Sequence, residues 1–130
     1  MSASKKQITI VAIDDDRGDL MILQRLLGRI TEWEVSLHLH SDPVEGIEYL
    51  TSGVCDVVIL DYDLGDENGL EIFERIRSTH SAIPVILWTG RGDSETEERA
   101  RSAGVSDYLP KSKVNRERLQ ATIGGVLARA

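Results

Sequence analysis

An unbroken apolar run that ends in an aspartate constrains the fold of this chain more than any other feature. Residues 57–60 read VVIL, and three acids, Asp61, Asp63 and Asp66, follow before a turn that closes at Gly69. A short continuous run rich in β-branched residues is typical of a strand buried on both faces of a parallel sheet. Ligands in open α/β sheets bind beyond the carboxyl ends of such strands, which makes Asp61 a candidate nucleophile or metal ligand.

The rest of the chain alternates between apolar strands and amphipathic helices. Further strands are predicted at residues 8–13, 33–40, 83–88 and 105–109. Apolar residues at helical spacing predict helices at about 20–30, 43–52, 70–79, 94–103 and 115–127. This alternation predicts a doubly wound α/β domain with a parallel sheet, in which the carboxyl ends of all strands meet at one edge.

The helix predicted at 94–103 has fewer apolar residues than the others. Ser94 and Glu97 have the spacing of a capping box at its start, and only Ala100 and Ala103 are available for burial. We therefore expect this helix to be the most loosely attached element of the domain.

Length and composition narrow the class of protein. A chain of 130 residues fits a single domain spanning 1–130. The net charge of −7 disfavours nucleic-acid binding, which needs clustered Lys and Arg. No apolar run reaches the ~20 residues that cross a bilayer, and residues 1–7 lack the apolar core of a signal peptide. With a single cysteine, these features predict a cytoplasmic protein without membrane partners, and we expect no output domain after the last helix.

Polar residues of three kinds follow the predicted strands at their shared edge. Acids follow strand 8–13, a threonine follows strand 83–88 and a lysine follows strand 105–109. The residues expected to converge at this edge are Asp14, Asp15, Asp61, Thr89 and Lys111.

The convergence of three carboxylates predicts a divalent cation between them. Carboxylates brought close together repel each other unless a cation intervenes, and an oxygen-only site with waters suits Mg²⁺. We assign direct ligation to Asp15 and Asp61. Asp14 would act through a water, and the backbone carbonyl of Asp63 would supply a further oxygen.

The same edge is suited to phosphoryl transfer. A carboxylate such as Asp61 can attack phosphorus and become an aspartyl phosphate. Lys111 offers a cation and Thr89 a hydroxyl donor for the phosphoryl oxygens, and this reaction depends mainly on positioning and charge neutralisation.

This order of residues resembles the receiver domain of bacterial two-component response regulators, of the stand-alone type. The resemblance covers residues 7–127 and rests on the segments IVAIDDD, DVVILDYDLGDENGLEI, PVILWTG and DYLPKS. It implies a flavodoxin-like sheet in the order 2-1-3-4-5, with Mg²⁺ as cofactor and a histidine kinase or histidine phosphotransfer protein as phosphoryl donor. Such a protein is a signalling protein that catalyses only its own phosphorylation and dephosphorylation.

The resemblance also implies roles for single residues. The acidic pair, the phosphorylated aspartate, the switch hydroxyl, the rotating aromatic and the essential lysine are Asp14 and Asp15, Asp61, Thr89, Tyr108 and Lys111. Phosphorylation would draw Thr89 toward the phosphoryl group, move Tyr108 inward and shift the helix at 94–103. The signal would then leave through the face formed by residues 94–127, toward a downstream protein or into a homodimer.

The chain departs from the family pattern at three places. Gly65 replaces the usual proline four residues after the phosphorylated aspartate, which predicts a more mobile turn. Gly90 replaces the usual alanine, and Ser112 follows Lys111 where a proline is usual. The cis Lys-Pro bond of the family is therefore excluded, and the geometry of the Lys111 loop stays open.

Asp63 and Arg91 each lie two residues after a predicted site residue. We expect them to pair across the mouth of the site and to obstruct the water that hydrolyses the phosphoryl group. An exposed pair contributes about 0–1 kcal/mol, so the pair would tune dephosphorylation more than stability.

Three other functions share parts of this pattern. Asp61-x-Asp63 after an apolar strand also resembles the haloacid-dehalogenase phosphatases, but the acidic pair before it and the lack of room for a cap domain disfavour an enzyme of that kind. An FMN-binding flavodoxin is disfavoured because acids replace the phosphate loop after the first strand. A degenerate receiver that only binds proteins is disfavoured by the intact acidic set.

Overall fold

The computed structural model describes residues 5–80 and 82–129. The predicted domain span of 1–130 therefore includes residues 1–4, 81 and 130, which lie outside the described part. The elements in chain order are β1 (Lys6–Ile13), α1 (Arg17–Gly28), β2 (Trp33–His40), α2 (Pro43–Ser52), β3 (Val57–Asp61), β4 (Asp63–Leu64), β5 (Glu67–Asn68), α3 (Gly69–Thr79), β6 (Val85–Thr89), α4 (Ser94–Ala103), β7 (Asp107–Pro110), the 3-10 turn η1 (Lys111–Lys113) and α5 (Arg116–Arg129).

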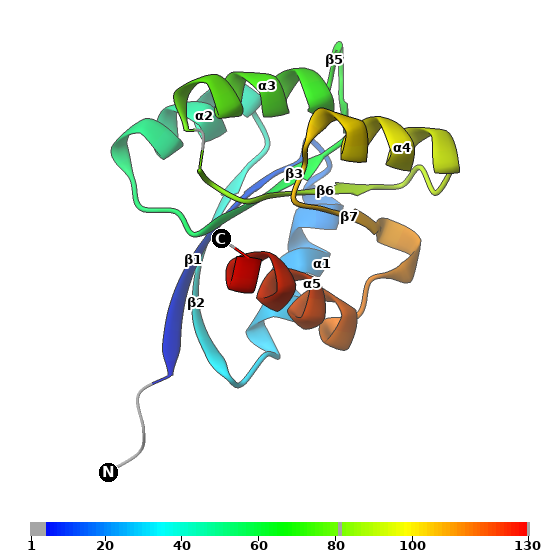
Figure 1. Ribbon diagram of the computed structural model, residues 1–130. Coiled ribbons are helices and arrows are strands. Elements are labelled where there is room, and N and C mark those ends of the chain that lie inside the picture. Colours follow the sequence, from blue (N-terminus) through cyan, green and yellow to red (C-terminus); the bar gives the residue numbers. More distant parts are fainter. Residues whose placement is uncertain (1–4, 81, 130) are drawn as a thin grey trace.

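Five parallel strands form the central sheet in the order β2-β1-β3-β6-β7. Because β6 and β7 are the fourth and fifth strands of this sheet along the chain, the predicted flavodoxin-like order 2-1-3-4-5 is confirmed. Helices α1 and α5 cover one face of the sheet, and α2, α3 and α4 cover the other (Figure 1). The fold is thus the three-layer α/β arrangement that the alternation of elements predicts.

Each face of the sheet packs its own hydrophobic core. One core joins β1, β3 and β6 to α1 and α5, with Leu23, Ile59 and Ile123 completely buried. The other joins the opposite side of the strands to α3, α4 and α2, with Phe73 and Ile76 at its centre. Strands buried on both faces explain why the sequence runs at β3 and β6 are continuously apolar.

The parallel register aligns the carboxyl ends of the strands. Ile13 lies beside Leu60, Asp61 beside Trp88, and Thr89 beside Pro110. The residues that follow these strands therefore emerge at the same edge of the sheet.

A short hairpin between β3 and α3 was absent from the sequence prediction. Strands β4 and β5 pair in antiparallel fashion, with Leu64 opposite Glu67. Gly65 is at the first central position of this turn and has a φ of 67°, a conformation that proline, with φ fixed near −65°, is unable to adopt. This turn therefore accommodates Gly65 and would not accommodate the proline that is usual in the family.

Gly69 places the start of α3 directly against the end of β3. Its N–H donates to the carbonyl of Tyr62 at 2.6 Å. A Cβ atom at this position would lie 2.4 Å from the backbone oxygen of Asp61, so only glycine fits here without a shift of the backbone.

The start and packing of α4 differ from the sequence prediction. Asp93, rather than Ser94, is the N-cap, and its side chain accepts from the N–H of Thr96 at 2.7 Å. Thr96 and Ala100 are the buried residues of this helix, whereas Ala103 is exposed. The predicted shortage of apolar contacts is confirmed, because Thr96 and Ala100 are the buried residues of α4 and both have small side chains.

No helix in the described part of the chain combines the length and the hydropathy that crossing a membrane requires.

Candidate functional site

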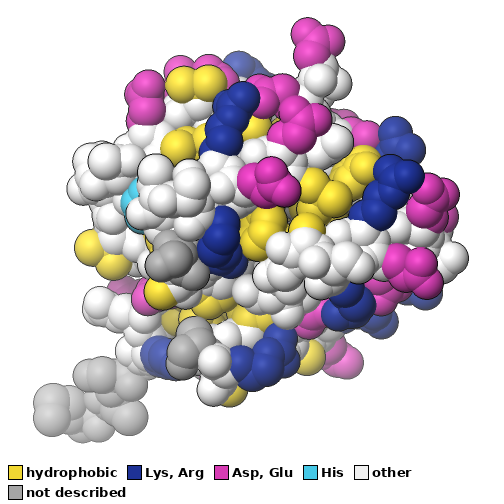
Figure 2. All heavy atoms as spheres, turned by 45° about the horizontal axis from the view of Figure 1, so that its top comes forward, with side chains coloured by type: hydrophobic (Ala, Val, Ile, Leu, Met, Phe, Trp, Pro, Cys, Tyr) yellow, Lys and Arg dark blue, Asp and Glu magenta, His cyan; other side chains and the backbone are white. Residues whose placement is uncertain are grey.

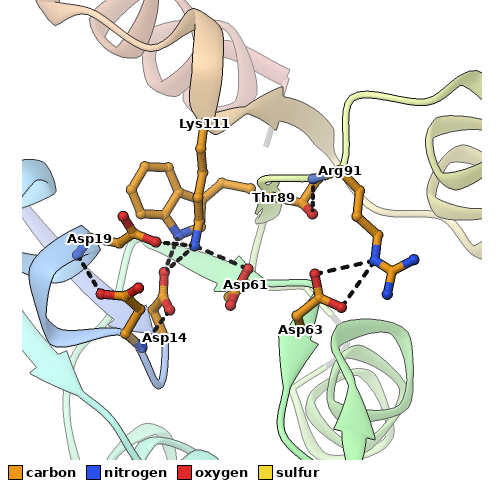
Figure 3. Close-up of polar contacts among 9 residues, drawn as sticks. Asp14, Asp19, Asp61, Asp63, Thr89, Arg91 and Lys111 are labelled. Atoms are coloured by element: carbon orange, nitrogen blue, oxygen red, sulfur yellow. Dashed lines mark hydrogen bonds and ion pairs between the residues drawn. The ribbon is translucent and has the colours of Figure 1, made fainter.

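Side chains from four strand ends meet at the carboxyl edge of the sheet (Figure 3). Asp14 follows β1, Asp61 ends β3, Thr89 ends β6, and Lys111 begins the 3-10 turn after β7. Carboxylate oxygens of Asp14, Asp15 and Asp61 lie within 4.8 Å of one another. The structure therefore brings together the residues that the sequence placed at one edge.

Asp14 is fully buried, and both of its carboxylate oxygens accept hydrogen bonds. Oδ1 accepts from the backbone N–H of Asp16 at 2.9 Å. Oδ2 accepts from the indole N–H of Trp88 at 3.1 Å and from the Lys111 ammonium at 2.7 Å. A carboxylate engaged in this way is held rigidly, and a bound cation would have to compete with these donors for its oxygens.

Lys111 lies at the centre of an ionic network. Its Nζ donates to Asp14 Oδ2 at 2.7 Å and to Asp19 Oδ2 at 2.6 Å, and lies 3.3 Å from Asp61 Oδ1. The ammonium also lies 4.8 Å from the centre of the Trp88 ring. Burial disfavours the charged form of Lys111, but the bonds to Asp14 and Asp19 outweigh burial and hold its pKa above the ordinary value.

Asp61 is nearly completely buried, with 3% of its surface exposed. Although Lys111 is within ion-pair distance, the geometry is not that of a hydrogen bond, and Oδ1 has no hydrogen-bond donor among the described residues. Burial and repulsion from Asp14 raise the pKa of Asp61 to about 7, against the opposing attraction of Lys111. The surroundings of the Asp61 carboxyl group therefore favour its neutral form.

The donor set fits a hard divalent cation. Asp15 is exposed, Asp61 has an unpartnered oxygen, and the carboxylates of Asp14, Asp15 and Asp61 are close enough to share an ion. Oxygen donors of this kind match the preference of Mg²⁺, which keeps several waters of its own when a protein binds it.

Thr89 is fully buried at the end of β6. Its hydroxyl oxygen accepts from the backbone N–H of Arg91 at 3.0 Å. Because a hydroxyl has one donor and two acceptor positions, this bond leaves its O–H able to donate to another oxygen. Figure 3 shows Thr89 between Lys111 and Arg91, on the side of the site where Asp61 lies.

Asp63 and Arg91 form the pair predicted from their positions. Nε of Arg91 donates to both carboxylate oxygens of Asp63, at 3.0 and 3.2 Å (Figure 3). The side chains are 51% and 56% exposed, and the guanidinium lies 5.4 Å from the Tyr62 ring centre. The pair is thus an exposed contact at the edge of the site, and its effect on hydrolysis stays a prediction.

Tyr108 is buried in this structure, with 6% of its surface exposed. Its hydroxyl donates to the backbone carbonyl of Arg91 in the loop before α4. The ring is therefore buried and its hydroxyl is bonded to the loop before α4, and the inward movement predicted from the sequence stays a prediction.

The surface formed by residues 94–127 carries a hollow between α4, β7 and α5, which includes Glu97, Tyr108 and Arg118. Ion pairs cover the α4 side of this surface: Arg99 with Glu95, and Arg101 with Glu97 and Asp107. Figure 2 shows acidic and basic side chains interspersed over the face that includes α3 and α4. The hollow is therefore polar and bordered by charges of both signs.

Two residues of the site were missed by the sequence prediction. Trp88 is the last residue before Thr89 in an apolar strand, and its indole nitrogen was not considered as a donor. Asp19 lies inside α1, where an acid in the first turn is ordinarily explained by the helix dipole. Asp19 lies three residues after the N-cap Asp16, and no local spacing in the sequence marks it as a partner of Lys111.

Comparison with known proteins places the chain among signalling domains. A sequence model described as the response regulator receiver domain matches residues 10–124. The transcriptional regulatory protein ZraR of Klebsiella oxytoca is 30% identical over 125 residues, which are 96% of this chain and 27% of that protein. This chain therefore spans about a quarter of the length of that relative.

Solved structures agree with this placement. A receiver domain protein from Clostridium thermocellum has a TM-score of 0.82 at 27% identity, covering 94% of this chain and 95% of that one. A CheY-like receiver domain protein from Methanospirillum hungatei JF-1 has a TM-score of 0.79 at 25% identity, covering 97% and 96%. The similarity thus extends over nearly the whole of both chains.

Proposed function

The chain belongs to the response regulator receiver domain family, and we propose that it accepts a phosphoryl group on Asp61 in a two-component system or phosphorelay. The observation that supports this most strongly is the state of the Asp61 carboxylate. It is buried, it has an oxygen without a donor among the described residues, and the Lys111 ammonium lies 3.3 Å away. A phosphoryl group attached there would supply oxygens to a site already lined with donors.

The proposed reaction is a displacement at phosphorus. An oxygen of Asp61 attacks the phosphorus of a phosphohistidine on a histidine kinase or phosphotransfer protein, and an O–P bond forms. The P–N bond of the donor breaks, and the imidazole leaves with the electron pair and takes up a proton. Lys111 binds the phosphoryl oxygens as a cation and the Thr89 hydroxyl donates to one of them, so this chain contributes positioning and charge.

Mg²⁺ is the proposed cofactor. Asp15 and Asp61 would hold it directly, Asp14 through a water, and the backbone carbonyl of Asp63 would add an oxygen. This division agrees with the burial of Asp14 and the engagement of both its oxygens. When bound, the cation neutralises charge on the carboxylates and on the transferred group.

We propose that the signal leaves through the residue 94–127 surface, toward a downstream protein or a second copy of the chain. Thr89 and Tyr108 join the site to the loop before α4 through Arg91. The few apolar contacts of α4 make a shift of this helix inexpensive. In this proposal the protein catalyses only its own phosphorylation and dephosphorylation. A cytoplasmic location stays a prediction from the sequence.

The test is phosphorylation by a small donor, which bypasses the unidentified kinase. Wild type, Asp61→Asn and the hairpin variant Asp66→Asn are incubated with acetyl phosphate and Mg²⁺ or EDTA. We expect one phosphoryl group per chain, in the peptide containing Asp61, for wild type and Asp66→Asn with Mg²⁺ only. Labelling of Asp61→Asn to the same extent, or steady turnover of p-nitrophenyl phosphate by wild type, would contradict the proposal.

A further inference from the structure

Asp19 shares the ammonium of the site lysine, although the sequence pattern did not include it in the site. The Lys111 Nζ is closer to Asp19 Oδ2, at 2.6 Å, than to Asp61 Oδ1, at 3.3 Å. The Lys111 and Asp19 side chains are 16% and 28% exposed, so solvent screens this ion pair less than an exposed one.

The ammonium has three N–H donors, and two of them are engaged by Asp14 and Asp19. Asp14 and Asp19 each accept one hydrogen bond from Lys111, whereas the nearest oxygen of Asp61 accepts none from the described residues. A phosphoryl group on Asp61 would present new acceptor oxygens close to the same ammonium. Because the ammonium lies closer to Asp19 than to Asp61, Lys111 would have to turn toward that group and so weaken its bond to Asp19.

We infer that Asp19 is a positioning residue that competes with the phosphoryl group for Lys111 and so lowers the affinity of the site for that group. The inference rests on the proposed function of Asp61. It assigns to the first turn of α1 a role in setting how firmly the phosphoryl group is held, separate from the cation ligands. An asparagine at this position keeps the shape and the helix turn but removes the charge that attracts the ammonium.

The experiment measures the binding of beryllofluoride, a stand-in for the phosphoryl group, in the presence of Mg²⁺. Emission of Trp88, whose ring centre is 4.8 Å from the ammonium, reports binding in a Trp33→Phe background. We expect Asp19→Asn to bind about three- to tenfold more tightly than its parent, the size expected for one partly screened ion pair. Asp19→Glu, which keeps the charge, should be close to the parent.

Asp16→Asn is the control for a general loss of negative charge near the site. Asp16 is the exposed N-cap of α1, and asparagine caps a helix as well as aspartate. Without beryllofluoride, Asp19→Asn should also shift Trp88 emission, because the position of the ammonium relative to the indole ring changes. Asp16→Asn should leave this emission unchanged. Glu71→Gln, at the corresponding first-turn position of α3, shows how much of any change in unfolding midpoint is due to the helix dipole.

The outcomes separate the inference from the proposed function. If the parent protein binds no beryllofluoride with Mg²⁺, the proposed function fails. If the parent binds it and Asp19→Asn binds equally tightly or more weakly, the role of Asp19 is refuted. An equal gain in Asp16→Asn would also refute it, because the effect would then be one of general charge.

Discussion

The two sides of the site around Asp61 differ in how firmly they are held. On the lysine side, which consists of Asp14, Asp19, Trp88 and Lys111, hydrogen bonds join residues far apart in the sequence, and Asp14 is fully buried. On the arginine side, which consists of Asp63, Thr89, Arg91 and Tyr108, the ion pair is more than half exposed and the loop leads into the polar helix α4.

This difference assigns separate tasks to the two sides. A largely buried network keeps its charges close to the site, so that only the Lys111 side chain has to turn when the phosphoryl group arrives. A loop with exposed contacts and a helix with few apolar neighbours can change position at low cost. We therefore expect binding to depend on the lysine side and the conformational response to depend on the arginine side.

The largest expected loss of stability follows truncation of the core beneath the lysine side. Leu23 of α1 is completely buried between the helix and the sheet. Leu23→Ala should lower the free energy of unfolding by about 2–5 kcal/mol, because buried apolar contacts are lost and a cavity remains. Urea denaturation provides the measurement, and a loss below about 1 kcal/mol would show that α1 is not firmly anchored.

The charge on Asp61 should destabilise the protein when no divalent cation is present. The pKa of Asp61 is raised to about 7 by burial and by Asp14, so its folded form prefers the neutral acid. The cost of ionisation is absent below about pH 4, grows as pH rises to about 7, and is constant above that. In EDTA, Asp61→Asn should therefore exceed wild type in unfolding free energy by about 2–4 kcal/mol at pH 8.

Urea denaturation in EDTA at pH 4, 6 and 8 checks the sign of this effect. The advantage of Asp61→Asn should shrink toward pH 4 and also shrink at pH 8 when Mg²⁺ is added, because the cation stabilises the wild-type carboxylate. An advantage that is the same at every pH would contradict the raised pKa.

A smaller effect is expected for the helix behind the arginine side. Ala100 is the buried alanine of α4. Ala100→Gly should cost about 1–2 kcal/mol through lower helix propensity and a lost methyl contact. Hydrogen exchange should become faster in α4 while α1 keeps its protection, and equal acceleration in both helices would show that α4 is not a separate unit.

The smallest effect on stability is expected at the exposed ion pair. Arg91→Ala should change the unfolding free energy by no more than about 1 kcal/mol, because the pair is solvated. It should nevertheless shorten the lifetime of the phosphoryl group, since the guanidinium no longer obstructs the approach of water. The decay of the acetyl-phosphate-labelled protein is the measurement, with Arg99→Ala on α4 as the matched control, and equal lifetimes in both variants and wild type would refute the obstruction.

The sequence predicted the parts of this molecule that depend on repeated patterns. Continuous apolar runs located β3 and β6 because these strands are buried on both faces, and the parallel topology then placed Asp14, Asp61 and Lys111 at one edge. This reasoning requires only the direction of the strands and the point at which each one ends.

The parts that could not be predicted depend on where a single side chain points. Trp88 was assigned to the core by its apolar ring, and only the structure shows its indole N–H directed at Asp14. The bond from Lys111 to Asp19 joins residues 92 positions apart and is invisible to local spacing. The prediction of the buried residues of α4 was half wrong. Ala100 is buried as predicted, but Thr96 is buried in place of Ala103, because a polar threonine is not expected in a core from the sequence.

Hydrogen exchange with and without beryllofluoride, in the presence of Mg²⁺, tests the division between the two sides most directly. The predicted result is a change of protection in the loop before α4, in α4 and in β7, with the amides of α1 and β1 unaltered outside the residues that contact the bound group. Changes of equal size in α1 and α4 would contradict the division, because the lysine side would then move as much as the arginine side.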